Sequence, residues 1–384
     1  MTIFVLTYFG VVGLLSAYVL CHLRRAVGPG WRFRTAAAAV AALVVLMPAL
    51  QRFGAGLPFP LLRVGAHLAD GWLFLLFWLF FLHLGFDLAW LATRPLAGLI
   101  PAWRGRWLPA AVQAGLCWLL AVTALLCGLA QGRLLAVREV EVLSDRLSFD
   151  APPLRLALVA DLHLGLTSLP GRAEEVARRL AELQPDLILC AGDFVDATEP
   201  PVREMVAPFA RLNPPLGKFA VVGNHEVYPG LDQTLELLRL AGFTALRNRV
   251  EPVGDAWQVV GVDDPQADLL AASPVSAETL LLPERRGFRY VILLKHRPEV
   301  SAAARERADL QLSGHTHGGQ VFPFDRCLRP FFPYLEGRLH ALPEGLRLYV
   351  SPGTGSWGLP VRFGTTAEIT LVTIRPLPLA AAPP

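Results

Sequence analysis

The chain has 384 residues, of which 53% are hydrophobic and only 17% are charged, and its mean hydropathy is +0.44. Soluble domains average about 25% charged residues, so part of this chain is predicted to lie in lipid. The composition excludes a disordered chain, a collagen-like repeat and a disulfide-rich scaffold. Residues 1–135 carry ten arginines, no lysine and two aspartates, a net charge of +8, and the remainder carries −5. The basic charge therefore belongs to the apolar part, and no nucleic-acid partner is expected.

Four apolar stretches precede residue 131, at about residues 3–20, 36–50, 71–92 and 109–130. Crossing about 30 Å of hydrocarbon takes about 20 helical residues, a length that the first, third and fourth stretches reach or nearly reach. The second stretch is short. We therefore predict an N-terminal transmembrane region of four helices over residues 1–131.

The arginines between these stretches predict the orientation, because short cytoplasmic loops carry an excess of positive charge. The first and third loops are richer in arginine than the second, which holds only Arg52 and Arg63. This pattern places everything after residue 131 outside the cytoplasm. If the second stretch does not span, the second half faces the cytoplasm instead. The bias of 33 arginines to two lysines is associated with GC-rich bacterial genomes, so a multi-pass protein of the bacterial inner (cytoplasmic) membrane is expected.

Two ionisable residues lie inside the third stretch, His83 and Asp87, four positions apart and thus on one helix face. Ionisable residues within a membrane are candidates for function. A mutually satisfied pair near the cytoplasmic interface explains them without a function, and a transporter built on the four helices is a further alternative.

From about residue 136 the pattern changes to short aliphatic runs that alternate with charged, helix-periodic runs. Such alternation predicts a layered α/β domain with helices outside the sheet. Strands are expected at residues 154–160, 186–191, 218–222, 257–262, 290–294, 310–312, 346–350 and 368–374. Helices are expected at residues 170–183, 231–240 and 298–308.

Polar residues follow directly where five of the apolar runs end. Ligands bind at the carboxyl ends of strands in α/β sheets, so these residues are predicted to share a site. In chain order the runs lead into Asp161-Leu-His163, Gly192-Asp193-Phe-Val-Asp196, Gly223-Asn224-His225-Glu226, Lys295-His296-Arg297 and Ser313-Gly314-His315-Thr316-His317-Gly318-Gly319.

The residue types in these motifs suit divalent metal ions. Carboxylate and amide oxygens with imidazoles, and no thiolate, are typical ligands of Mn²⁺, Fe or Zn²⁺. In the DxH and HxH spacings, the strand period of two puts both side chains on one face. The number of ligand-type residues exceeds what one ion needs. It suits two ions about 3.5–4 Å apart that share a carboxylate and clamp a phosphoryl group.

The motifs DLHLG, GDFVD, GNHE, LLKHRPE and SGHTHGGQ together resemble those of the calcineurin-like metallophosphoesterase superfamily. The ending YVSPGTGSWGLPVRFGTTAEITLVTI resembles that of its membrane-anchored bacterial branch. The resemblance covers about residues 137–375. It implies an α/β fold, the four-layer α-β-β-α metallophosphoesterase sandwich, over residues 136–376, and we expect a disordered tail at residues 377–384.

The resemblance also implies a hydrolase acting on phosphomono- or diester bonds, with two divalent metal ions (Mn, Fe or Zn) and a metal-bridging hydroxide. His225 would act as general acid or as a donor to the phosphoryl oxygen, and Asp196 would hold its tautomer and orientation. Many relatives carry arginine after the second-motif aspartate where this chain has Ala197, which weakens a charge-assisted phosphate contact there. The implied ligands are Asp161, His163 and His317 for the first ion, Asp193 for both, and Asn224, His296 and His315 for the second.

A proline- and aromatic-rich segment follows the last motif and contains Phe322-Pro-Phe324 and Arg329-Pro-Phe331-Phe332-Pro-Tyr334. It is either an ordinary packed loop or an apolar lip that admits a lipid-linked phosphate or pyrophosphate. The alternative function is a catalytically idle membrane scaffold or sensor with a phosphoesterase-like domain. Idle copies lose ligands, whereas this chain retains every one.

Overall fold

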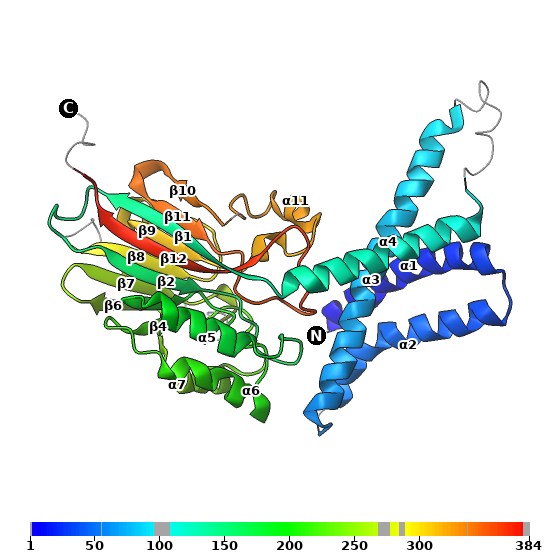
Figure 1. Cartoon of the computed structure of the whole chain (residues 1–384), viewed down its shortest axis with the longest axis horizontal. Helices are drawn as coiled ribbons and strands as arrows, with labels where there is room; N and C mark the ends of the chain where they lie inside the picture. The colour runs from blue at the N-terminus through cyan, green and yellow to red at the C-terminus, as the bar shows by residue number, and fades with distance from the viewer. Residues whose placement is uncertain are drawn as a thin grey trace. The chain divides into compact units, whose positions relative to one another are not determined.

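The protein is described from a computed structural model over residues 2–54, 56–95, 108–267, 277–283, 289–335 and 337–378. The chain divides into two compact units, Met1–Leu129 and Ala130–Pro384. The first contains long helices, and the second contains two β-sheets with shorter helices (Figure 1). The arginines at positions 104 and 106 and most of the predicted C-terminal tail lie outside the described residues.

The helices of the first unit are longer than the apolar stretches in the sequence. Each is long and apolar enough to cross a membrane. We had expected the second stretch to be short, and this was wrong. Its helix begins at Trp31, so that it includes Arg32 and Arg34, and it offers a 20-residue apolar span, Trp31–Leu50. The helices are α1 (Thr2–Val27), α2 (Trp31–Phe53), α3 (Phe59–Thr93) and α4 (Ala110–Gly132).

The predicted pair of α3, His83 and Asp87, is connected through α1. Tyr18 donates a hydrogen bond to Asp87 (2.8 Å), and His22 Nε2 lies 3.1 Å from the same carboxylate oxygen. The His22 ring stacks on that of His83, with 4.2 Å between ring centroids. His22, which the sequence analysis did not single out, therefore contacts both members of the predicted pair.

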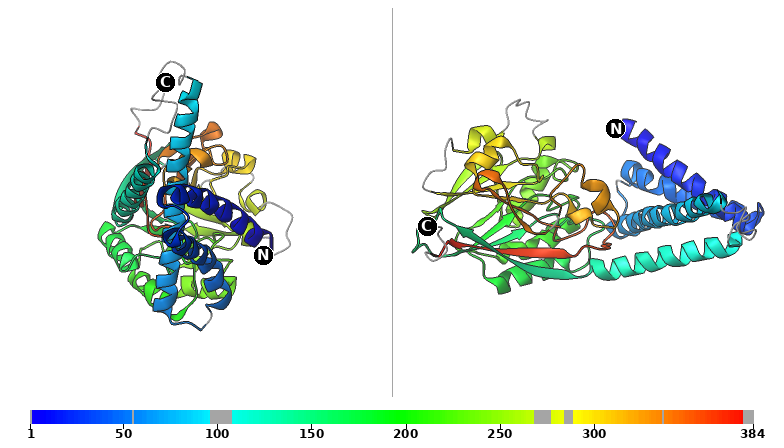
Figure 2. Two further views of the ribbon diagram at one scale, coloured as in Figure 1. Left: turned by 90° about the vertical axis from the view of Figure 1, so that its right-hand side faces the viewer. Right: turned by 90° about the horizontal axis from the view of Figure 1, so that it is seen from above.

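The second unit contains two six-stranded sheets. The first has the order β1-β12-β2-β3-β4-β5 and the second β10-β11-β9-β8-β7-β6. The long strands β1 and β12 run side by side in parallel (Figure 2). The strands of the first sheet are β1 (Leu135–Ser144), β12 (Ala367–Pro376), β2 (Leu154–Val159), β3 (Leu187–Cys190), β4 (Lys218–Ala220) and β5 (Thr244–Ala245). Those of the second are β10 (Leu339–Ala341), β11 (Arg347–Val350), β9 (Leu310–Ser313), β8 (Tyr290–Lys295), β7 (Trp257–Val262) and β6 (Arg249–Val253).

Both sheets carry buried side chains on two faces, because alternate residues of a strand point to opposite sides. In β2, Leu156 and Leu158 enter a core shared with residues of the second sheet such as Ile292. Ala157 and Val159 face the opposite way, into a core shared with helices. The aliphatic run of β2 is therefore explained by burial on two sides.

Helices cover the outer face of each sheet, and the four-layer α-β-β-α architecture is confirmed. The first core packs under α5 (Arg172–Leu183), α6 (Pro200–Val206), the 3₁₀ helix η3 (Ala207–Arg211) and α7 (Leu231–Leu240). A separate core on the second sheet packs under α9 (Ala277–Leu281) and α10 (Ala302–Arg307). The remaining short helices are η4 (His317–Gly319), α11 (Phe324–Leu328) and η5 (Pro343–Gly345).

One expected helix boundary was wrong and one strand was missed, each for a local reason. The helix expected from Pro298 begins only after Ser301, whose hydroxyl accepts a hydrogen bond from the N–H of Ala304 (3.0 Å) and caps it. The edge strand β1 was not anticipated, because only Leu135, Val142 and Ser144 of its ten residues are buried and it lacks a clear apolar signal.

Candidate metal centre

The polar residues predicted at strand ends come together at the carboxyl ends of β2, β3, β4, β8 and β9. The five strands belong to both sheets, so the site lies where the two sheets meet at this edge. Among the residues that the structure describes, three groups of His, Asp or Glu have ligand atoms within 4.8 Å of one another. They are Asp161, His163 and His317; His163, Asp193 and His225; and Asp193, His296 and His315.

The backbone at this edge adopts left-handed conformations. Asp161, His163, Asp193, His315 and His317 all have positive φ, between 49° and 74°. Such conformations cost of order 1–3 kcal/mol each outside glycine, and they persist where surrounding contacts impose them. Asp and His tolerate this region better than most residues. The strain concentrates on the predicted ligands, which is typical of a functional site.

In the group of Asp161, His163 and His317, three buried side chains lie close together. His163 Nε2 lies 3.0 Å from His317 Nε2, and His317 Nε2 lies 3.8 Å from Asp161 Oδ1. Two imidazole nitrogens at this distance attract each other only if one carries a proton or a cation lies between them.

The group of Asp193, His296 and His315 is built in the same way, with side chains that follow strands of both sheets. His296 Nε2 lies 3.1 Å from Asp193 Oδ2, 3.1 Å from His315 Nδ1 and 3.2 Å from Asn224 Oδ1. Asp193 Oδ2 is also 3.8 Å from His163 Nε2 of the first group. Asp193 thus adjoins both groups, as a shared carboxylate would. The donor set of oxygens and imidazoles, with no thiolate, fits divalent metal ions.

The pKa values of four histidines in the ligand groups are shifted in opposite directions. Burial lowers the pKa of His163, but Asp196 and Asp193 outweigh it and raise that pKa to about 9. Burial and Asp193 act in the same way on His296, whose pKa rises to about 10. Burial lowers the pKa of His315 to about 3 and that of His317 well below its usual value, so both are neutral.

Metal binding is therefore expected to release protons. A metal ion binds the neutral imidazole, so at neutral pH it must displace the protons held by His163 and His296. Because the pKa values of His163 and His296 are both raised, the apparent affinity of the protein for metal ions should increase with pH up to about 9–10. Titration calorimetry in two buffers of different ionisation enthalpy measures the protons released, and an affinity independent of pH would contradict the expectation.

Asp196 holds two histidines instead of the one predicted. Its Oδ1 lies 2.6 Å from His163 Nδ1 and 2.9 Å from His225 Nδ1. It therefore contacts the Nδ1 atom of both rings and fixes their orientation.

Glu226, at the end of the GNHE motif, was missed as a functional residue. It is fully buried, and its carboxylate accepts four backbone N–H groups, from Gly223 (2.8 Å), Asp193 (2.9 Å), Phe194 (2.6 Å) and Val195 (3.2 Å). This fastens the turn after β3 to the turn after β4. Its place in the motif was the signal in the sequence, but the four N–H donors could be identified only in three dimensions.

Arg362 is a second missed residue. It is fully buried and donates to the carbonyls of Gly353 (3.3 Å) and Gly355 (2.6 Å), while the N–H of Gly355 donates to the carbonyl of Asp161 (3.0 Å). A Cβ at Gly353 would lie 3.2 Å from Asp161 Cβ and 3.3 Å from His317 Nδ1. Arg362 therefore holds the loop that packs directly behind the first ligand group.

Replacing Arg362 by methionine should weaken metal binding at the first group by about tenfold, the lower end of the effect of losing an outer partner of a metal ligand. Lys218→Met is the matched control, because Lys218 is also buried and donates only to carbonyls, of Phe209 and Ala241. Competition titration with a chelating dye measures the affinity. Equal loss in both variants would show that Arg362 acts only through general stability.

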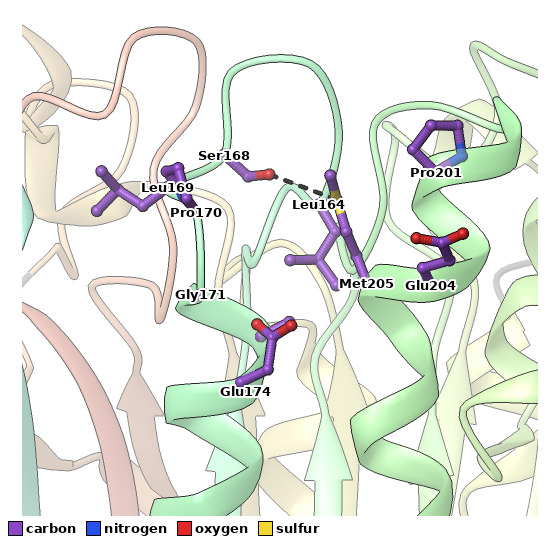
Figure 3. Close-up of a pocket in the computed structure, with 10 residues that line it drawn as sticks. Leu164, Ser168, Leu169, Pro170, Gly171, Glu174, Pro201, Glu204 and Met205 are labelled. Atoms are coloured by element: carbon purple, nitrogen blue, oxygen red, sulfur yellow. Dashed lines mark hydrogen bonds between the residues drawn. The ribbon is translucent and has the colours of Figure 1, made fainter. Parts of the chain in front are cut away.

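A shallow pocket of about 220 Å³ lies beside this edge, between the loop before α5 and helix α6 (Figure 3). Leu164 and Met205 form an apolar part, and Glu174 and Glu204 are carboxylates at its border. None of the predicted metal ligands lines it. The pocket is therefore separate from the metal centre.

A family model described as calcineurin-like phosphoesterase matches residues 154–319. An uncharacterized metallophosphoesterase of Aquifex aeolicus is 36% identical over 222 residues, which cover 58% of this chain and 85% of that protein. The chain belongs to the calcineurin-like phosphoesterase family. It is thus a hydrolase acting on phosphoester bonds, as the sequence predicted.

Relatives within this family also include membrane proteins. A transmembrane protein with metallophosphoesterase domain from Bos taurus is 34% identical over 261 residues, 63% of this chain and 58% of that protein. An uncharacterized metallophosphoesterase of Helicobacter pylori is 31% identical and covers 62% of this chain and 64% of that protein. The chain thus spans less than two thirds of both proteins. The four apolar helices and these relatives support a membrane-anchored phosphoesterase.

Proposed function

We propose that this chain is a membrane-anchored phosphoesterase with a dinuclear metal centre that hydrolyses phosphomono- or diesters. Residues 136–376 would form the catalytic domain and residues 1–131 the membrane region. The observation that supports this most directly is the overlap of the ligand groups at Asp193, whose carboxylate adjoins both. A shared carboxylate is what two ions about 3.5–4 Å apart require.

The residues would divide between the ions as the motifs imply. Two divalent ions supply Lewis acidity to a phosphoryl oxygen and lower the pKa of bound water. Mn, Fe and Zn all suit the ligand chemistry. The first ion would be held by Asp161, His163, His317 and Asp193, and the second by Asp193, Asn224, His296 and His315.

His225 would act on the substrate directly. Its Nδ1 is engaged by Asp196, and the side chain is 18% exposed, so the other ring nitrogen is accessible to a phosphoester. It would donate a proton to the leaving oxygen or a hydrogen bond to the phosphoryl group. His225→Ala should lower kcat by about a hundredfold, the lower range for loss of a general acid, with metal binding retained. Loss of metal together with activity would assign His225 to the ligands instead.

The substrate class that we propose is a lipid-linked phosphate or pyrophosphate. Four helices long and apolar enough to span a membrane would keep the site near lipid. The arginine distribution between the helices would put the catalytic domain on the extracytoplasmic side of a bacterial inner membrane.

The function is tested with purified full-length protein in detergent. Hydrolysis of chromogenic phosphomono- and diesters is measured after chelation and after addition of Mn²⁺, Fe²⁺, Zn²⁺ or Mg²⁺ in turn. We expect no turnover in the chelated protein and recovery with at least one metal. Metal-independent turnover, or none with any metal on soluble and lipid phosphoesters, would contradict the proposal.

A further inference from the structure

Exposed aromatic side chains gather around the metal centre. In the described part of residues 130–384, six aromatic side chains belong to the exposed large hydrophobic ones. Five of them follow the carboxyl ends of β4, β9 and β11, on loops or, for Phe324, on α11, and we call these five the aromatic rim: Tyr228, Phe322, Phe324, Phe331 and Trp357. The sixth, Phe149, lies in the turn before β2, at the amino end of that strand.

The aromatic rim adjoins the catalytic side chains. The Tyr228 hydroxyl accepts a hydrogen bond from Asn224 Nδ2 (3.2 Å), and its ring lies 5.1 Å from that of His225. The Trp357 ring lies 6.3 Å from the His225 ring. A compound that approaches His225 from solvent would therefore meet the rim.

Specific contacts hold the loops that carry the rim. Gln320 and Trp357 exchange two hydrogen bonds of 2.9 Å between the glutamine side chain and the tryptophan backbone. The N–H of Phe322 donates to the carbonyl of Phe363 (2.8 Å). The helix α11 that follows has no buried residue. These loops are thus fixed while their apolar side chains remain exposed, at 61% for Trp357 and 76% for Phe331.

Basic groups accompany the rim. The Arg326 guanidinium lies over the Phe322 ring, 5.8 Å from its centroid, and Arg329 is also exposed. The acid in this stretch, Asp325, has a buried carboxylate oxygen. Aromatic rings beside arginines are typical of surfaces that insert between lipid headgroups, where arginine meets anionic phosphates.

We propose that the aromatic rim and Arg326 dock on an anionic bilayer leaflet, so that phosphoester lipids reach the metal centre from the membrane surface. The proposal deepens the proposed function and rests on it. Scattered exposed hydrophobic residues need no explanation, but five of the six exposed aromatic residues described in residues 130–384 follow the carboxyl ends of β4, β9 and β11, and two of them lie beside His225. The membrane is the favoured partner because the same chain carries four helices apolar enough to span one.

Cys327 on α11 is exposed and reports on docking. In full-length protein with Cys21→Ser and Cys127→Ser, a nitrobenzoxadiazole label is placed on Cys327, while Cys117 and Cys190 are buried. After reconstitution in phosphatidylcholine vesicles with phosphatidylglycerol, we expect blue-shifted emission that brominated lipids quench. The control label is on Glu182→Cys, an exposed position near the end of α5, in a Cys327→Ser background.

Emission from Cys327 equal to that of the control would overturn the proposal. A shift that appears only at high protein-to-lipid ratio would also overturn it, because a second copy of the chain would then cover the rim. A shift that needs phosphatidylglycerol supports the contribution of Arg326, and its loss in Arg326→Gln supports it further.

The second test separates docking from chemistry. The variant Phe322→Ser, Phe324→Ser, Phe331→Ser should keep hydrolysis of a soluble chromogenic phosphoester. On a phosphoester lipid in vesicles, its rate should fall at least about tenfold, since burial of one such ring is worth that much. Phe149→Ser is the matched control. Equal rates on both substrates would overturn the docking proposal. Absence of all hydrolysis by the wild type would count against the proposed function, and the Cys327 emission would then decide docking alone.

Discussion

Asp193→Asn is expected to abolish most of the metal-dependent activity, with a fall in kcat of at least about a thousandfold, because several kcal/mol of charge stabilisation depend on the ions. Asp193 is buried, adjoins both ligand groups, and accepts a hydrogen bond from the backbone N–H of His225 (2.9 Å). Asparagine can still accept that bond, so the turn keeps its partner. The substitution therefore removes the negative charge that the two ions would share.

The pKa of Asp193 supports this choice of residue. Burial raises it, but His296 and then His163 lower it well below the usual range, so the carboxylate is ionised. Asp309→Asn is the matched control. Asp309 is equally buried, accepts from the N–H of Val291 (2.8 Å), and lies before β9, at the end away from His315. Metal binding and activity in the control should remain as in the wild type. A similar loss in both variants would contradict a special role of Asp193.

Glu226→Gln is expected to destabilise the second unit and to loosen the metal centre. A glutamine presents an NH₂ group to backbone N–H donors that now share one carboxylate, so at least one buried donor loses its acceptor. Hydrogen bonds to charged groups contribute about 1.5–3 kcal/mol each. For a unit of this size, that loss should lower Tm by roughly 5–10 °C.

The experiment on Glu226 needs a control that separates a loss of stability of the second unit from a displacement of the metal ligands. Glu368 is also buried, and its carboxylate pairs with Arg138 (3.1 Å) on β1 instead of with the turns after β3 and β4. Glu368→Gln should lower Tm in calorimetry without changing metal affinity, whereas Glu226→Gln should change both. Unchanged metal affinity in Glu226→Gln would show that the turns after β3 and β4 do not need the carboxylate.

The sequence was sufficient for those features that depend on short-range pattern. Strands such as β7 and helices such as α7 carry clear periodicity, and the ligand-type residues follow strand ends directly. The family assignment followed from five such motifs in order, which the comparisons confirm. The roles of the individual site residues stay predictions.

Features that depend on long-range packing could not be predicted. The second role of Asp196 appears only when His163 and His225, 62 positions apart, converge on one oxygen. Arg362 is the clearest case: nothing in its neighbourhood in the sequence shows that its guanidinium is buried behind Asp161. His22 contacts Asp87 only because α1 and α3 pack together.

The most direct test of the dinuclear centre is the number of ions per chain. Full-length protein is loaded with Mn²⁺ or Zn²⁺, freed of excess metal, and measured by elemental analysis against protein concentration, together with Asp193→Asn and Asp309→Asn. We predict about two ions per chain in the wild type and in Asp309→Asn, and at most about one in Asp193→Asn. One ion or none in the wild type under saturating metal would contradict the dinuclear centre.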